Sequence, residues 1–185
     1  MDKNDDDKLA WREASQKLLL KTPVMDITQT DSVSPDGEIR HYIVMNAPDW
    51  VITVPVLGDR LLMVRQWRHG EKSMSVEFPG GVSEKNETPE QAAKRELKEE
   101  TGYTANKMVF LGSVNPNPAL MSNHVHIFAA YDLENSGEQS LDSDEYINLM
   151  KVSKKEALKN LGTKEYQHAL MSTAMAFFMR YENSL

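Results

Sequence analysis

The apolar positions along the chain predict an early β section, a central helix, further strands and a helical end. Two pairs of apolar, β-branched runs are each joined by a short glycine-containing turn sequence, which is typical of β-hairpins. These pairs are residues 24–33 with 38–45, and residues 50–57 with 60–67. Shorter apolar runs predict further strands at residues 74–78, 108–114, 124–131 and 146–152. Two more helices are expected, at residues 154–160 and 164–181.

The central helix has its start and stop signals in the sequence itself. Thr88 is a capping residue, Pro89 suits the first helical position, and Gln91 completes a capping box with Thr88. Gly102 can adopt the left-handed conformation that closes a last helical turn. We therefore expect a helix that begins after Thr88 and ends at Gly102.

Composition narrows the class of protein. The chain has 185 residues, of which 40% are hydrophobic and 26% charged, values of an ordinary globular domain rather than a disordered chain. Lys and Arg number 21 against 28 Asp and Glu, and the net charge of -7 argues against nucleic acid as a partner, because nucleic acid requires a basic surface. The absence of cysteine excludes disulfides, thiolate metal sites and a cysteine nucleophile.

No segment of the sequence resembles a targeting signal or a membrane-spanning helix. Residues 1–8 are acidic and lack the apolar core of a signal peptide, so we expect residues 1–10 to form a flexible acidic tail. The longest apolar stretch, residues 174–179, is too short to cross a bilayer. These features predict a cytoplasmic protein without a membrane partner.

Three carboxylates share one side of the central helix. At about 100° per residue, Glu96, Glu99 and Glu100 fall within an arc of roughly 100°. This arc lies beside the apolar stripe of Ala93 and Leu97. Like charges at this spacing destabilise a helix unless a cation sits among them, and oxygen ligands suit Mg²⁺ or Mn²⁺. The alternative is a solvated acidic face paired with Lys94, Arg95 and Lys98.

The letters around this helix match a known motif. They are Gly81, Glu87 and the run Arg95-Glu96-Leu97-Lys98-Glu99-Glu100-Thr101-Gly102-Tyr103. This pattern resembles the Nudix box, and it departs from the box only at Tyr103, where the box prefers an aliphatic residue. The resemblance implies an α/β fold, the Nudix α/β/α sandwich with a mixed β-sheet. It also implies hydrolysis of a nucleoside diphosphate linked to another group.

Residues outside the box point to one branch of the family. The runs Val64-Arg65-Gln66-Trp67-Arg68 and Glu77-Phe78-Pro79-Gly80-Gly81, with Pro118 further on, resemble the ADP-ribose pyrophosphatase branch. This implies a metal-dependent hydrolase that cleaves nucleoside diphosphate sugars, ADP-ribose first, to a nucleoside monophosphate and a sugar phosphate. The alternatives are another nucleoside diphosphate sugar such as GDP-mannose, a nucleotide triphosphate or dinucleotide, or a non-catalytic ligand sensor.

The resemblance also implies roles for single residues. Glu96 and Glu100 are expected as principal metal ligands, with the Gly80 carbonyl as a backbone ligand. Glu99 is expected as a further ligand or as a contact to metal-bound water. Arg95 is expected to pair with Glu87 and orient the carboxylates. The catalytic candidates are thus Glu99, Arg95 and a base on a late loop.

Several residues are candidates for the base and for the substrate contacts. Glu145 is the first candidate for the base because an apolar strand follows it, and Asp142 and Asp144 are its rivals. Arg65 and Arg68 carry planar donor forks that suit phosphate, although they can equally be solubilising charges on an edge strand. The further expected substrate contacts are Trp50 and Pro118.

The chain is expected to divide into two segments. Residues 11–48 are expected to form an N-terminal antiparallel β section that serves dimerisation, and residues 49–185 the hydrolase domain, which predicts a homodimer. His124 and His126 share a strand face, but two histidines without a third ligand make a poor zinc site. Met171, Met175 and Met179 recur at helical spacing and are expected in the core or at a subunit contact.

Overall fold

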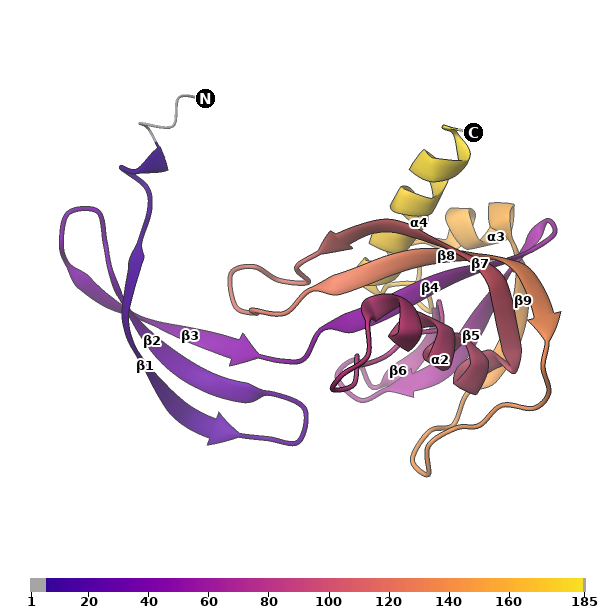
Figure 1. Ribbon diagram of the computed structural model, residues 1–185, viewed down its shortest axis with the longest axis horizontal. Coiled ribbons are helices and arrows are strands. Elements are labelled where there is room, and N and C mark those ends of the chain that lie inside the picture. Colours follow the sequence, from indigo (N-terminus) through magenta and orange to yellow (C-terminus); the bar gives the residue numbers. More distant parts are fainter. Residues whose placement is uncertain (1–5, 185) are drawn as a thin grey trace. The chain divides into compact units, whose positions relative to one another are not determined.

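The computed structural model describes residues 6–184 (Figure 1). The strands are β1 (Arg12–Lys21), β2 (Asp26–Val33), β3 (Ile39–Asn46), β4 (Trp50–Leu57), β5 (Arg60–Arg68), β6 (Ser73–Glu77), β7 (Tyr103–Val114), β8 (Val125–Asn135) and β9 (Asn148–Ser153). The helices are α2 (Pro89–Thr101), α3 (Lys154–Asn160) and α4 (Ala169–Glu182). Two compact units result, one from the residues up to 48 together with 115–123, the other from residues 49–114 and 124 onward. Residues 1–5 of the predicted acidic tail lie outside the described residues.

The first unit is built on a three-stranded antiparallel sheet in the order β1-β2-β3. The predicted hairpin at residues 24–45 is confirmed as β2 and β3, joined at Gly37 with a φ of 90°. β1 was not predicted as a strand, and all its residues are exposed. A strand without a buried face carries no selection for alternating apolar residues, so its sequence shows no periodic signal.

The second unit contains a mixed sheet in the order β6-β5-β4-β8-β7, with β9 also paired to β5. β4 and β8 are parallel, and the other pairs are antiparallel. The predicted hairpin at residues 50–67 forms only next to its turn, where Val56 pairs with Leu61 and Leu57 with Arg60. Beyond those pairs the two strands diverge, because β4 takes β8 as its partner and β5 takes β9. That part of the hairpin prediction is therefore corrected.

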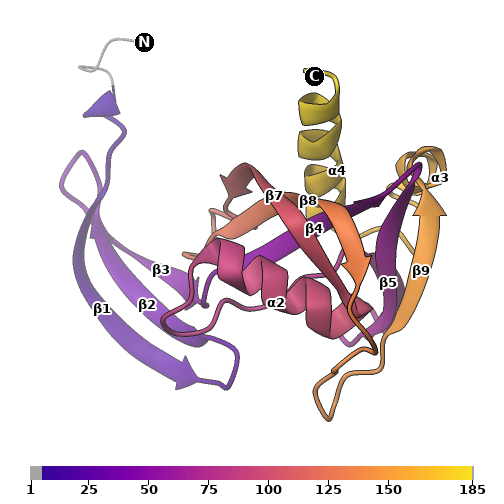
Figure 2. The ribbon, with the colours of Figure 1, turned by 45° about the vertical axis from the view of Figure 1, so that its right-hand side comes forward.

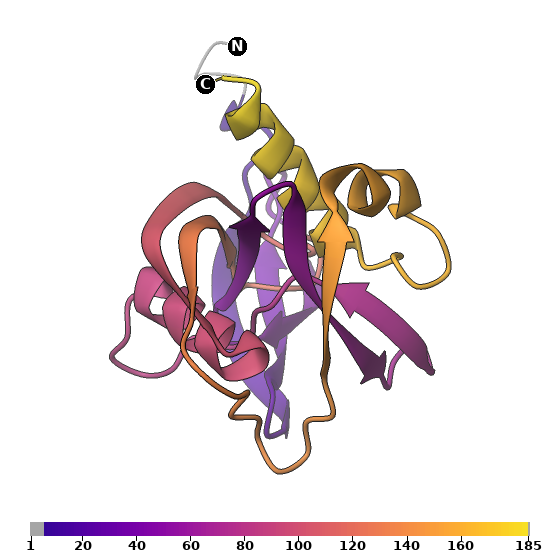
Figure 3. The same cartoon turned by 90° about the vertical axis from the view of Figure 1, so that its right-hand side faces the viewer.

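Helices cover both faces of this sheet, as Figures 2 and 3 show. Val51 of β4 packs with Ala92 and Ala93 of α2. The next residue, Ile52, belongs to the core that holds Met171, Met175 and Phe178 of α4. Since neighbouring strand residues point to opposite faces, α2 and α4 lie on opposite sides of the sheet. The expected α/β/α arrangement is confirmed, and so is the core position of Met171 and Met175.

The helix boundaries follow local signals. α2 begins with the predicted capping box and ends at Gly102, whose φ is 72°. α3 occupies the predicted residues 154–160. α4 begins at Ala169 rather than at residue 164, because the His168 side chain caps it and the preceding residues form turns. Among the helices of residues 6–184, none is long and apolar enough to cross a bilayer.

Candidate active site

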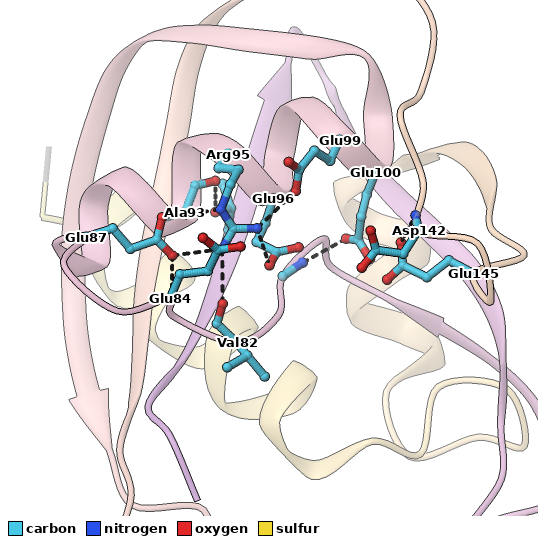
Figure 4. Close-up of polar contacts among 12 residues, drawn as sticks. Val82, Glu84, Glu87, Ala93, Arg95, Glu96, Glu99, Glu100, Asp142 and Glu145 are labelled. Carbon is cyan, nitrogen blue, oxygen red and sulfur yellow. Dashed lines mark hydrogen bonds and ion pairs between the residues drawn. The ribbon is translucent and has the colours of Figure 1, made fainter. Parts of the chain in front are cut away.

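The site is built on the polar side of α2, next to the segment that follows β6. Ala92, Ala93 and Leu97 face the core. Of the helix carboxylates, Glu96 and Glu100 reach that segment, and Glu99 lies beside Arg95 (Figure 4). We call these three glutamates the carboxylate cluster. Glu100 is only 3% exposed, although it is a glutamate. A carboxylate is rarely buried without a partner, so the cluster requires an explanation.

Arg95 holds two members of the cluster. Its Nη1 donates to Glu96 Oε1 and to Glu99 Oε2, both at 2.9 Å. Its Nη2 and Nε donate to the two Glu87 oxygens at 2.8 and 3.2 Å, and Nη2 also reaches the Val82 carbonyl at 3.0 Å. The predicted pair of Arg95 and Glu87 is therefore present. One guanidinium thus contacts three carboxylates and offsets part of their negative charge, which reduces the repulsion among them.

Glu100 is held from the segment after β6. Its Oε2 accepts the Gly80 amide at 2.8 Å. The Pro79 and Gly81 carbonyls on either side accept amides of β4 at 2.9 Å each. In extended backbone the amide and carbonyl of one residue point to the same side, and this side alternates along the chain. The Pro79 and Gly81 carbonyls thus face β4, whereas the Gly80 amide faces Glu100 of α2.

Both glycines are required by close approach. A Cβ at Gly80 would lie 2.1 Å from the Val51 carbonyl oxygen, which is backbone of β4. A Cβ at Gly81 would lie 2.5 Å from Glu96 Oε1, the end of a flexible side chain. The absence of a side chain at these two positions lets the segment pass between β4 and the carboxylate cluster.

Burial changes the pKa of two carboxyl groups in the cluster, Glu96 and Glu100. Desolvation raises the pKa of Glu100 to about 8, and the nearby charges of Glu96 and Glu145 add to the rise against the lowering effect of the Gly80 amide. Burial likewise raises the pKa of Glu96, although its ion pair with Arg95 opposes the rise. The site therefore binds protons more readily than ordinary carboxylates do. A bound cation would likewise offset the cost of burying these negative charges.

The donor set fits a hard divalent cation in its chemistry. It consists of the carboxylate cluster and the Gly80 carbonyl, all oxygen ligands of the kind that Mg²⁺ and Mn²⁺ prefer. Across residues 6–184, however, no three acidic or histidine side chains converge closely enough to hold a metal ion. The reason is visible in the contacts, since Glu96 and Glu99 lean on Arg95 while Glu100 leans on Gly80. Cation binding therefore requires these side chains to exchange partners.

A late loop brings another carboxylate to the cluster. Glu145 Oε2 accepts the Asp142 amide at 3.1 Å, and the Glu145 amide donates to the Asp142 carbonyl at 3.0 Å. Figure 4 shows the Glu145 carboxylate directed toward Glu100. Of the three acidic candidates on this loop, Glu145 is partly buried, whereas Asp142 and Asp144 are exposed.

The two predicted phosphate-binding arginines already hold carboxylates. Arg68 Nε and Nη2 donate to the two oxygens of Glu77 at 2.8 and 2.6 Å. Arg65 Nη2 donates to Glu165 at 2.9 Å. Glu77 is 1% exposed, and burial would raise its pKa, but the hydrogen bonds and charge of Arg68 bring the pKa below its ordinary value. The sequence contains one indication of this pair, because Glu77 is a charged residue within the apolar run that forms β6.

The remaining candidates are spread over both units. Trp50 begins β4, is partly buried and donates its amide to the His124 carbonyl at 2.9 Å. His126 Nε2 lies 3.1 Å from Asp49 Oδ2, and His124 is exposed. Pro118 belongs to residues 115–123 of the first unit and is exposed.

Comparison with known proteins agrees with this geometry. A model of the NUDIX domain matches residues 47–171. The chain is 33% identical to the ADP-ribose pyrophosphatase of Bacillus subtilis (strain 168), over 94% of this chain and 95% of that protein. It is 29% identical to the methanol dehydrogenase activator of Bacillus methanolicus, over 83% and 85% of the two chains.

A solved structure shares the fold. The crystal structure of an ADP compounds hydrolase superposes with a TM-score of 0.85 at 23% identity and covers 95% of this chain and 96% of the other. The motif from Gly81 to Tyr103 lies inside the matched domain and forms the carboxylate cluster described above. The chain belongs to the Nudix hydrolase family.

Proposed function

We propose that this protein hydrolyses the pyrophosphate of a nucleoside diphosphate sugar, with ADP-ribose as its preferred substrate. The products are a nucleoside monophosphate and a sugar phosphate. The observation that carries the proposal is the carboxylate cluster, whose buried member Glu100 accepts the Gly80 amide. The similarity to an ADP-ribose pyrophosphatase over nearly the whole chain supports the choice of substrate.

The carboxylate cluster and the Gly80 carbonyl are the groups that would hold Mg²⁺ or Mn²⁺. When bound, such a cation supplies charge neutralisation of the pyrophosphate and a more acidic water. Arg95 and Glu87 keep the ligand carboxylates oriented, because the guanidinium contacts Glu96 and Glu99 from one side. A shift of either carboxylate away from Nη1 frees its oxygen as a ligand while the Glu87 contact holds Arg95 in place.

Glu145 is the proposed general base. Its carboxylate lies toward the cluster, and it accepts the proton that the attacking water loses. Partial burial favours Glu145 over Asp142 and Asp144, because an exposed carboxylate is directed to solvent rather than to the site.

Arg65, Arg68, Trp50 and Pro118 are the proposed substrate contacts. Arg68 donates its Nε and Nη2 to Glu77, and its Nη1 is the group proposed to bind phosphate. Arg65 is paired with Glu165 at the surface, and a phosphate oxygen can take the place of the Glu165 carboxylate.

The first unit is proposed to mediate a homodimer, as the exposed apolar side chains of its sheet suggest.

A panel of substrates tests the proposal. ADP-ribose, GDP-mannose, a nucleotide triphosphate and a dinucleotide are each incubated with the protein, with and without Mg²⁺, and the products are separated by chromatography. We expect Mg²⁺-dependent release of a nucleoside monophosphate, fastest from ADP-ribose. Binding without turnover in any metal condition would identify a ligand sensor instead, and faster cleavage of another compound would reassign the substrate.

A further inference from the structure

The loop that carries Glu145 is attached to the end of α2. The last carbonyls of a helix have no partners within the helix and must be satisfied from outside. Here the Ser140 amide donates to the Glu99 carbonyl at 2.9 Å, and the Ser136 amide donates to the Gly102 carbonyl at 2.8 Å. The Glu100 carbonyl between them accepts from a side chain, that of Gln139.

Gln139 makes two contacts that connect different elements. Its Nε2 donates to the Glu100 carbonyl at 2.5 Å and to the Ile147 carbonyl at 3.5 Å. Glu100 belongs to the carboxylate cluster, and Ile147 is a buried residue two positions after Glu145. One amide group therefore joins the backbone of a proposed metal ligand to the backbone two residues after the proposed base.

Apart from the Ser136 and Ser140 amides, this part of the loop is open on one side. A cavity of about 700 Å³ lies beside it, lined among others by Gln139, Leu141, Leu149 and Lys151. An open cavity provides no packed apolar contacts on that side, so hydrogen bonds must supply more of the positioning. Gln139 is itself partly buried, whereas its neighbours Glu138 and Ser140 are exposed. The one side chain turned inward at this point is thus the one with both contacts.

We propose that Gln139 is a positioning residue that holds the Glu145 carboxylate at a set place relative to the carboxylate cluster. It acts through backbone carbonyls and touches neither substrate nor metal. The amide is required because both acceptors are carbonyl oxygens, to which a carboxylate cannot donate. This inference rests on the proposed role of Glu145 as the base.

Kinetics of matched variants test the proposal. Gln139→Ala and Gln139→Glu each remove the donor, and Glu138→Ala changes the exposed neighbour as a control. We expect kcat for ADP-ribose to fall about tenfold in both Gln139 variants with little change in KM, and to stay near wild type in the control. A Gln139→Ala enzyme with the kcat of the control would overturn the proposal.

A double-mutant cycle separates positioning from general destabilisation. If Gln139 acts through Glu145, the double variant Gln139→Ala with Glu145→Gln should be no slower than Glu145→Gln alone. A further tenfold loss in the double variant would show that Gln139 acts elsewhere and would contradict the inference.

Hydrogen exchange provides a readout that does not depend on activity. In Gln139→Ala, the amides of Ser140 and Glu145 should exchange about tenfold faster, while that of Leu97 within α2 should not change. Unchanged exchange at both loop amides would overturn the attachment itself. If the wild type cleaves none of the panel substrates but the exchange result holds, the attachment stands and the proposed function fails.

Discussion

Glu100 is the residue at which stability and function conflict most directly. Folding removes its carboxylate from water and raises its pKa from 4.5 to about 8, so the folded protein binds a proton at Glu100 more tightly than the unfolded chain does. It follows that the metal-free protein loses stability as the pH rises from about 4.5 through about 8. A cation among the ligands reverses this penalty.

Replacing Glu100 by glutamine should therefore separate the two effects. The amide can still accept the Gly80 hydrogen bond, but it carries no buried charge and is a weak metal ligand. We expect Glu100→Gln to lose at least about 100-fold in kcat, to melt no lower than wild type at pH 8 without metal, and to lose the Tm increase that Mg²⁺ gives the wild type. Glu96→Gln should show a smaller loss of activity.

Glu90→Gln is the matched control, since Glu90 lies on the same helix in an exposed ion pair with Lys94. It should keep both the turnover and the Mg²⁺ response. Near-normal turnover with unchanged metal dependence in Glu100→Gln would remove Glu100 from the ligand set.

A second test at this scale concerns the base. Glu145→Gln should lower kcat by about 10²–10⁴-fold with little change in substrate affinity, because a base acts in the transition state. Asp142→Asn and Asp144→Asn should each stay within a few-fold of wild type, since both side chains are exposed. Steady-state kinetics at saturating Mg²⁺ compare the three. A large loss in one of the aspartate variants alone would move the role to that residue.

At the scale of elements, the site depends on how closely the segment after β6 passes α2. Gly81→Ala would push the flexible end of Glu96, so we expect weaker Mg²⁺ binding but nearly unchanged metal-free stability. Gly80→Ala would meet the β4 backbone, which cannot move aside, and should cost about 2 kcal/mol or more of unfolding free energy.

Gly70→Ala serves as the control for both, because its Cβ would meet nothing within 4 Å. Denaturant unfolding and thermal shift with increasing Mg²⁺ measure the two effects. Equal behaviour of the Gly80 and Gly81 variants would show that the two close approaches have the same consequence, contrary to this expectation.

At the scale of the whole molecule, the first unit exposes large apolar side chains on its sheet. Ile39 and Ile43 are 61% and 42% exposed and lie on one face of β3. Sedimentation at micromolar concentration should therefore detect a homodimer. The double variant Ile39→Asp with Ile43→Asp should shift it toward monomer, whereas Lys17→Glu on exposed β1 should not. A wild-type monomer would rule out this use of the sheet.

Local chemistry explains what could be predicted about the helix and the motif. The start and end of α2 follow from Thr88, Pro89, Gln91 and Gly102, all within the helix or beside it. The sharing of one helix side by Glu96, Glu99 and Glu100 follows from the helical repeat alone. The family followed from the same letters, since motif and helix coincide.

Interactions between distant segments account for what could not be predicted. Beyond the turn, β4 pairs with β8 and β5 pairs with β9 instead of with each other. The residues next to the turn carry no information about these distant partner strands. Glu77 and Gln139 were given no role, because the groups that define them lie on other elements.

By itself, then, the sequence determined the α2 helix, its acidic side and the family, because capping and helical periodicity act between residues a few positions apart. Only the tertiary structure decided which carboxylates are buried, where Arg95 divides its donors and which late-loop residue turns toward the cluster. The physical reason is that burial and long-range hydrogen bonds depend on which distant segments pack together, and packing is a property of the whole fold.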